Sequence, residues 1–110
     1  MSSNQPYSEQ YRLAAEDWVD KDAAARLYEE TKSAELERRK QALMRETGEM
    51  PDNRAERMVK SSDDWLAYVR KVVDTKTEAN RARVVLKVLE MQYYEHAAQN
   101  ATARAEMRMG

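Results

Sequence analysis

Apolar residues recur at helical spacing along one long stretch of this chain, from Ser62 to about Met107. The stretch contains no Gly and no Pro, the two residues that cost most inside a helix. Its apolar residues follow alternating steps of three and four, which places them on one side of a helix. We therefore expect a long helix over residues 62–107. The stripe is Trp65, Val69, Val72, Ala79, Leu86, Tyr93 and Ala97, with Lys76, Arg83 and Glu90 at the intervening steps.

A second stretch free of Gly and Pro precedes it and predicts a helix over residues 7–46. Its first apolar residues follow a four-three-four spacing, which is a helical face. Asp20 and Asp22 can cap the start of a helix, so we expect a kink or register change at residues 19–21. The polar residues 1–6 are expected to form a flexible N-terminus. The face is Tyr7, Tyr11, Ala14 and Trp18.

Between the two helices, residues 47–53 carry the clearest helix-stopping signals in the chain. Gly48 stands where a left-handed cap belongs, and Pro51 follows it. Two long helices joined by one short connector predict an antiparallel helical hairpin, coiled-coil-like, as a single all-α domain over residues 7–110. Candidate caps for a short helix over residues 54–60 and for the long helix are Asp52, Asn53, Ser61 and Ser62.

The distribution of charge supports this antiparallel pairing. Residues 9–30 hold seven acids and three bases, whereas residues 70–87 hold six bases and two acids. Folding the chain back near residue 50 brings these two segments alongside each other, in one chain or between chains. The expected core is Tyr11, Trp18, Trp65, Val69, Val72, Leu86, Leu89 and Tyr93.

Composition limits how large that core can be. Leu, Val, Ile and Phe together number only 15, which is few for a conventional globular core. The abundance of Ala, Glu, Lys and Arg is typical of long helices and coiled coils. Two helices alone bury too little apolar surface for comfortable stability. We therefore expect a homo-oligomer, with a dimer favoured, that assembles into a helical bundle.

The chemically reactive residues indicate that the protein is not an enzyme. There is no Cys, and His96 is the only His, so a nucleophile–His pair has to use hydroxyls that lie mostly at caps and termini. Tyr93 stands three residues before His96, where a di-metal helical bundle needs Glu. With two Gly in the chain there is no Gly-rich phosphate loop. We expect no catalytic residue, no metal and no cofactor.

The sequence also carries a prediction of location. No apolar run is long enough to span a bilayer, and the first residues lack the charged start and apolar centre of a signal peptide. The lack of Cys is compatible with a reducing cytosol. We expect a cytoplasmic protein with no membrane partner.

A basic segment followed by aromatic residues suggests nucleic-acid binding as a second function. Arg81, Arg83 and Lys87 could follow a phosphate backbone, and Tyr94 could stack on a base. However, the acidic segment 9–30 is expected to lie beside them and to neutralise part of their charge. Nucleic-acid contact is therefore an alternative to protein contact and is not favoured over it.

Several segments carry a family likeness: Asp22–Ala25 with Lys32–Ala34, Met50–Pro51 with Arg54–Glu56, Trp65–Asp74, and Ala101–Met107. These segments resemble a group of small helical proteins encoded by tailed phages and prophages of proteobacteria. The resemblance covers most of the chain and includes no mechanistic motif. It implies a phage origin and expression in the host cytoplasm, and it raises two roles, an accessory of DNA recombination and an inhibitor of a host protein.

The sequence therefore predicts a non-enzymatic, phage-type helical protein that acts by self-association and by contact with a host or phage protein. One alternative is a nucleic-acid-binding accessory of phage DNA recombination. The other is an inhibitor of a host protein.

Overall fold

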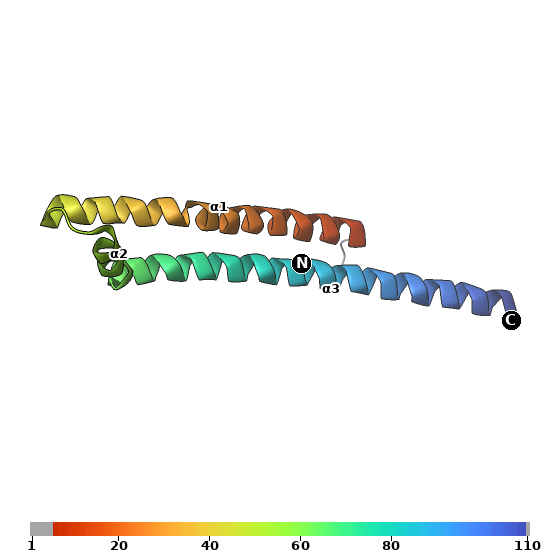
Figure 1. Ribbon diagram of the computed structural model, residues 1–110. Coiled ribbons are helices and arrows are strands. Elements are labelled where there is room, and N and C mark those ends of the chain that lie inside the picture. The colour runs from red at the N-terminus through yellow and green to blue at the C-terminus, as the bar shows by residue number, and fades with distance from the viewer. Residues whose placement is uncertain (1–5, 110) are drawn as a thin grey trace.

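The computed structural model describes residues 6–109, which form three α-helices and no strand: α1 (Tyr7–Thr47), α2 (Asp52–Lys60) and α3 (Asp63–Met109). Helices α1 and α3 pack side by side and antiparallel, and α2 lies at the turn between them (Figure 1). The molecule is a rod of 86 × 20 × 19 Å. The predicted all-α class is confirmed, and the long helices form a hairpin. The predicted N-terminal segment 1–6 lies outside the described residues except for Pro6.

Helix α1 is one helix of 41 residues. It begins after Pro6, whose carbonyl accepts the backbone N–H groups of Glu9 and Gln10 at 3.1 and 3.0 Å. No new helix starts at Asp22, because its carboxylate pairs with Arg26 one turn later, at 2.9 Å. Pairs at this spacing support a helix instead of ending it.

Helix α1 ends at Gly48, as the connector predicts. Gly48 has φ +95°, a backbone conformation that favours Gly, and its N–H donates to the carbonyl of Met44 at 2.8 Å. Helix α2 begins at Asp52, two residues earlier than predicted. The reason is that Pro51, with its fixed φ, takes the cap position that we expected for Asp52 or Asn53.

Ser62 joins the end of α2 to the start of α3. Its hydroxyl donates to the carbonyl of Val59 at 2.6 Å and accepts the backbone N–H of Trp65 at 3.2 Å. The second bond satisfies one of the free N–H groups of the first turn of α3. Asp63 and Asp64 lie in that turn, where the helix dipole favours negative charge.

Two rows of residues, each repeating every seven positions, form the face of α3 that packs against α1. The second row begins at Tyr68, one residue earlier than the predicted Val69, so Lys76 and Arg83 are turned toward solvent. This shift avoids the burial of charged groups, which is costly. We call the two rows the seam. They are Trp65, Val72, Ala79, Leu86 and Tyr93 in the first, and Tyr68, Thr75, Ala82, Leu89 and His96 in the second.

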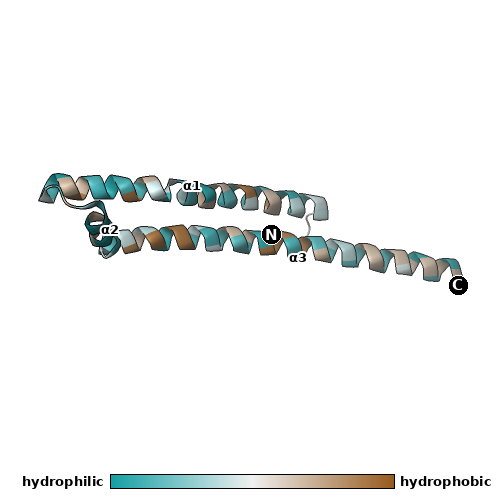
Figure 2. Cartoon of the chain, viewed as in Figure 1, coloured by the Kyte–Doolittle hydropathy of each residue, from teal (hydrophilic) through white to brown (hydrophobic). Residues whose placement is uncertain are grey.

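The core that the seam forms with α1 is thin. Among residues 6–109, no large side chain is wholly buried. The buried residues of α1 are Ala14, Ala25 and Lys40, while Leu27 is 62% exposed. More of the strongly apolar residues lie on α3 than on α1 (Figure 2). The hairpin therefore leaves apolar surface uncovered.

Candidate interaction surfaces

The open end of the rod, where α1 begins, is marked by a cluster of aromatic rings. The ring of Tyr7 lies 6.2 Å from that of Tyr93 and 5.3 Å from that of His96, measured between centroids. Tyr94 adds an edge contact with Tyr93 at 5.7 Å. These contacts follow from the antiparallel pairing, because Tyr7 is the first residue of α1 and meets α3 near its two-thirds point. These contacts mark the place on α3 where packing against α1 begins.

Beyond this cluster α3 runs on past the start of α1, and no other described helix lies beside it there (Figure 1). We call the segment Ala97–Met109 the overhang. All of its residues are exposed, and Met107 is 81% exposed. At 1.5 Å per residue it is about 20 Å long. At the start of the overhang, the side chain of Asn100 is hydrogen-bonded to that of His96, with 3.2 Å between the two nitrogen atoms.

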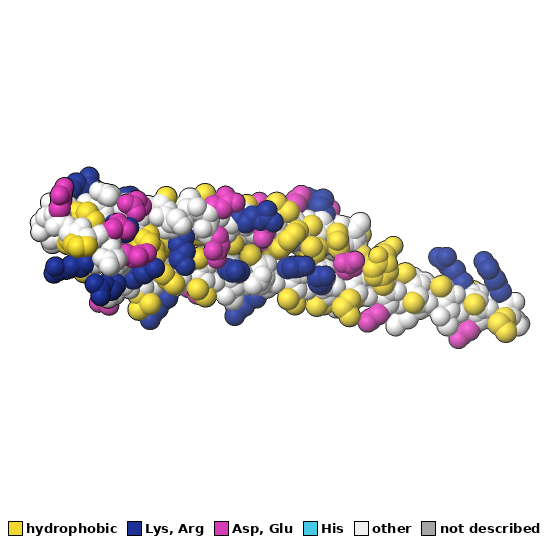
Figure 3. All heavy atoms as spheres, in the orientation of Figure 1, with side chains coloured by type: hydrophobic (Ala, Val, Ile, Leu, Met, Phe, Trp, Pro, Cys, Tyr) yellow, Lys and Arg dark blue, Asp and Glu magenta, His cyan; other side chains and the backbone are white. Residues whose placement is uncertain are grey.

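A hollow of about 340 Å³ lies beside the aromatic cluster, between α1 and α3. The neighbouring outer face of α3 carries Val84, Val88 and Met91, which are 60%, 45% and 62% exposed and follow a four-three spacing. The space-filling view shows apolar side chains along the rod, with a group of them where α1 begins and α3 runs on (Figure 3). Apolar groups exposed together on a small protein mark contact surfaces. The hollow is lined by Ser8, Tyr11, Leu89, Glu90, Tyr93 and Tyr94.

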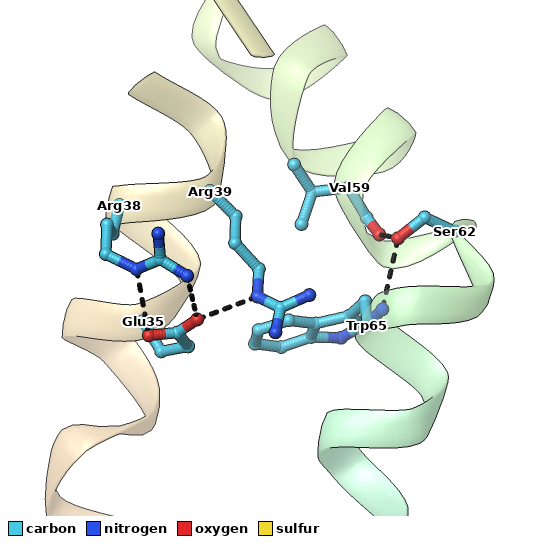
Figure 4. A network of polar contacts seen from close by, with 6 residues as sticks. All are labelled: Glu35, Arg38, Arg39, Val59, Ser62 and Trp65. Carbon is cyan, nitrogen blue, oxygen red and sulfur yellow. Dashed lines mark hydrogen bonds and ion pairs between the residues drawn. The ribbon is translucent and has the colours of Figure 1, made fainter. Parts of the chain in front are cut away.

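The turn end carries a polar cluster that links α1 to α3 (Figure 4). The Nε of Arg39 donates to Glu35 at 2.8 Å, and its guanidinium carbon lies 5.8 Å from the Trp65 ring and 5.4 Å from the Tyr68 ring. Those two rings stack at 5.2 Å. Hydrogen bonds from Arg38 and then Arg39 lower the pKa of Glu35 to about 2. This cluster is built to hold the helices together.

Next to this cluster, a groove of about 760 Å³ runs between the three helices. Its lining mixes both signs of charge with apolar and aromatic groups, so its chemistry selects no single class of ligand. The lining holds three acidic and three basic side chains, so no net charge attracts a ligand of one sign. The lining includes Tyr28, Glu35, Arg38, Glu46, Met58, Asp64 and Lys71.

Lys40 is a structural residue that sequence reasoning missed. Its side chain is buried, and its ammonium group lies 2.7 Å from Asp52 and 3.1 Å from Glu37. Hydrogen bonds to Asp52 and then Glu37 raise the pKa of Lys40. The pair with Asp52 ties the start of α2 to α1. A signal was present, since position 40 continues the face that passes through Leu36 and Leu43.

The residues proposed for nucleic-acid contact are all exposed but do not share one face. Arg81 and Arg83 are two positions apart, so they point about 160° apart around the helix. Arg83, Lys87 and Tyr94 do lie on one side of α3 at helical spacing. Among residues 6–109, the ion pair between α3 and the acidic segment 9–30 of α1 is that of Lys76 with Glu29, at 3.9 Å.

The residues proposed for the core occupy very different depths. The two tyrosines at the open end are the least covered. In order of exposure they are Trp65, Val72 and Leu89 (buried), Trp18, Val69 and Leu86 (half-buried), and Tyr11 and Tyr93 (exposed).

Comparison with known proteins gives no further guide, because no family model, curated protein or solved structure matches the chain. Over residues 6–109, no three His, Asp or Glu side chains form a group that could hold a metal ion. None of the helices in that range is both long and apolar enough to cross a membrane.

Proposed function

We propose that this protein is a non-enzymatic helical hairpin that self-associates, with a dimer favoured, and acts by contact with another protein. The observation that carries the proposal is the uncovered apolar surface at the open half of the rod. Val84, Val88 and Met91 are about half exposed or more, and Met107 on the overhang is more exposed still. Large apolar groups gathered in this way are typical of surfaces that another protein covers.

The thin core supports the same proposal. The buried residues of α1 are small or charged, so the hairpin by itself gains little from burying apolar surface. A second copy supplies additional burial without requiring any further segment of this chain. The resemblance to phage proteins makes a phage or host protein the proposed further partner, met in the host cytoplasm, and inhibition of a host protein is one form that such contact takes.

Melting at several protein concentrations tests self-association. If the folded state is a dimer, mass action stabilises it as concentration rises, so Tm should increase with protein concentration over a hundredfold range. A Tm that is independent of concentration, for a chain that melts cooperatively, contradicts the proposal.

A nucleic-acid-binding accessory of phage recombination is the second candidate function, and the side shared by Arg83, Lys87 and Tyr94 favours it. It predicts binding of a labelled single-stranded oligonucleotide that weakens steeply as salt rises. The double change Arg83→Glu with Lys87→Glu should abolish that binding. Arg70→Glu is the control, since Arg70 lies elsewhere on α3. Equal binding by the double variant and the unchanged chain excludes this role for these residues.

A further inference from the structure

We propose that two copies of this chain associate end to end, with their overhangs packed antiparallel so that the pair is centred near Ala103. This geometry rests on the proposed self-association. The segment that covers each overhang is the overhang of a second copy of this chain. Each overhang covers the other, and the two rods point in opposite directions.

The first argument is that the seam continues into the overhang. The spacing that places Tyr93 and His96 against α1 carries on, in the same register, to Asn100, Ala103 and Met107. None of these three residues is acidic or basic. Helix α1 begins at Tyr7, which contacts Tyr93 and His96, so this face of α3 packs against α1 up to that point. Beyond it, no other part of residues 6–109 packs on this face, and the residues of α3 are exposed. The open face is therefore an extension of an interface that already exists.

Charge also favours a second copy. The charged side chains of the overhang are Arg104, Glu106 and Arg108, and none of them is one of the three residues that continue the seam. Between Ala97 and Ala103 the overhang has no acidic or basic side chain. This face therefore offers a charged partner no group to pair with, whereas a second copy meets it through the same uncharged residues.

The third argument is size and shape. Ala103 is the middle residue of the exposed face, and a small residue at that position allows two helices to approach closely. Full overlap of the two segments brings Ala103 of each copy to the same level. Met107 then falls within about one helical turn of His96 of the second copy. Its exposed thioether reaches the aromatic cluster there, and sulfur–aromatic contacts are favourable.

The competing arrangement pairs two copies side by side through Val84, Val88 and Met91. This outer stripe spans only about two helical turns before it reaches Arg81 on one side and Glu95 on the other. It also does not continue any contact that the hairpin makes. The end-to-end arrangement is therefore the better supported of the two.

Small-angle X-ray scattering on the full chain, at concentrations where it self-associates, separates the two arrangements. Two rods of 86 Å that overlap over their overhangs have a maximum dimension of about 150 Å. Side-by-side pairing through the outer stripe gives about 100 Å. A self-associated particle of about 100 Å overturns the end-to-end geometry and leaves the self-association itself standing. A particle with the mass and the length of a single rod at every concentration overturns both.

Matched variants test the contact residue by residue. Because the chain has no Cys, Ala103→Cys introduces a single thiol, and mild oxidation should link two copies through it. Ala105→Cys, on the opposite side of the same turn, should link poorly. Ala103→Glu should raise the dimer dissociation constant about tenfold or more, because two carboxylates then face each other, whereas Ala105→Glu should not. Both positions are exposed, so circular dichroism should show an intact helix in each. Equal behaviour of the two positions overturns the proposal.

Discussion

Arg39 of α1 lies over the indole ring of Trp65 of α3, with its guanidinium carbon 5.8 Å from the ring centroid. The hydrogen bond from its Nε to Glu35 holds the guanidinium in that position. Together with Lys40 and Asp52, this contact gives the turn end specific polar links between helices. The open end has ring contacts and a bare segment of α3 instead. The two ends of the rod thus differ: polar contacts link the helices at the turn end, whereas α3 is exposed beyond the ring contacts at the open end.

Replacing Trp65 should destabilise the hairpin severely. Its side chain is buried, stacks on Tyr68 and lies under Arg39. Trp65→Ala is expected to lower the free energy of unfolding by about 3–5 kcal/mol, since a large buried ring is lost. Trp18→Ala is the comparison, and its cost should be smaller because Trp18 is only half-buried. Urea unfolding measures both, and an unchanged midpoint for Trp65→Ala contradicts the described core.

Acid should weaken the polar cluster at the turn end. The folded-state pKa of Glu35 is about 2, below its ordinary value of 4.5, so its ion pairs contribute stability that is fully present above about pH 4.5. That contribution is lost as pH falls from about 4.5 to about 2. Glu35→Gln has no such carboxylate, so its unfolding midpoint should fall less over this window than that of the unchanged chain. If the unfolding midpoints of the two proteins fall equally over this window, the ion pairs of Glu35 do not stabilise the folded state.

The pKa of Lys40 should respond to Asp52. Because hydrogen bonds to Asp52 and Glu37 raise this pKa above 10.5, Asp52→Asn should bring it down. The chemical shift of the Lys40 Cε carbon, followed by NMR as pH is raised, reports the change. Asp63→Asn is the control, since Asp63 lies in α3 and makes no described pair with Lys40. A titration that is the same in both variants means that the link between α1 and α2 does not form in solution.

A side chain at Gly48 should strain the turn. Its φ of +95° with ψ 166° is a conformation that residues with a Cβ rarely adopt. Nothing lies within 4 Å of an added Cβ, so the cost comes from the backbone alone. Gly48→Ala should therefore lose about 1–3 kcal/mol of unfolding free energy. Thr47→Ala, one residue earlier in ordinary helix, should change it by about 0.5 kcal/mol or less. Equal midpoints for the two variants show that the turn relaxes.

Much of this fold follows from the sequence because helical spacing is a strong local signal. The two long stretches free of Gly and Pro became α1 and α3 with ends within about two residues of the expected ones. Gly48 ended α1, and Ser62 capped α3, since both act through bonds to neighbours in the chain. Local rules suffice for features that depend only on local partners.

Features that depend on the facing helix were harder to predict. Val69 and Tyr68 are both apolar and adjacent, so spacing alone does not decide which one belongs to the seam. Tyr68 does, because its ring meets Tyr28 of α1 and stacks on Trp65. Lys40 was missed for a similar reason, since its burial depends on Asp52 arriving from α2. The proposed interaction surface is harder still to predict from the sequence, because its partner is a second molecule.

Sedimentation velocity on the full chain, over a wide range of concentrations, tests the central claim most directly. The account predicts a discrete, strongly elongated species of about twice the 12.8 kDa chain mass, which dissociates on dilution. A single species of 12.8 kDa at every concentration contradicts it, and the exposed apolar side chains of α3 then require a partner other than a second copy.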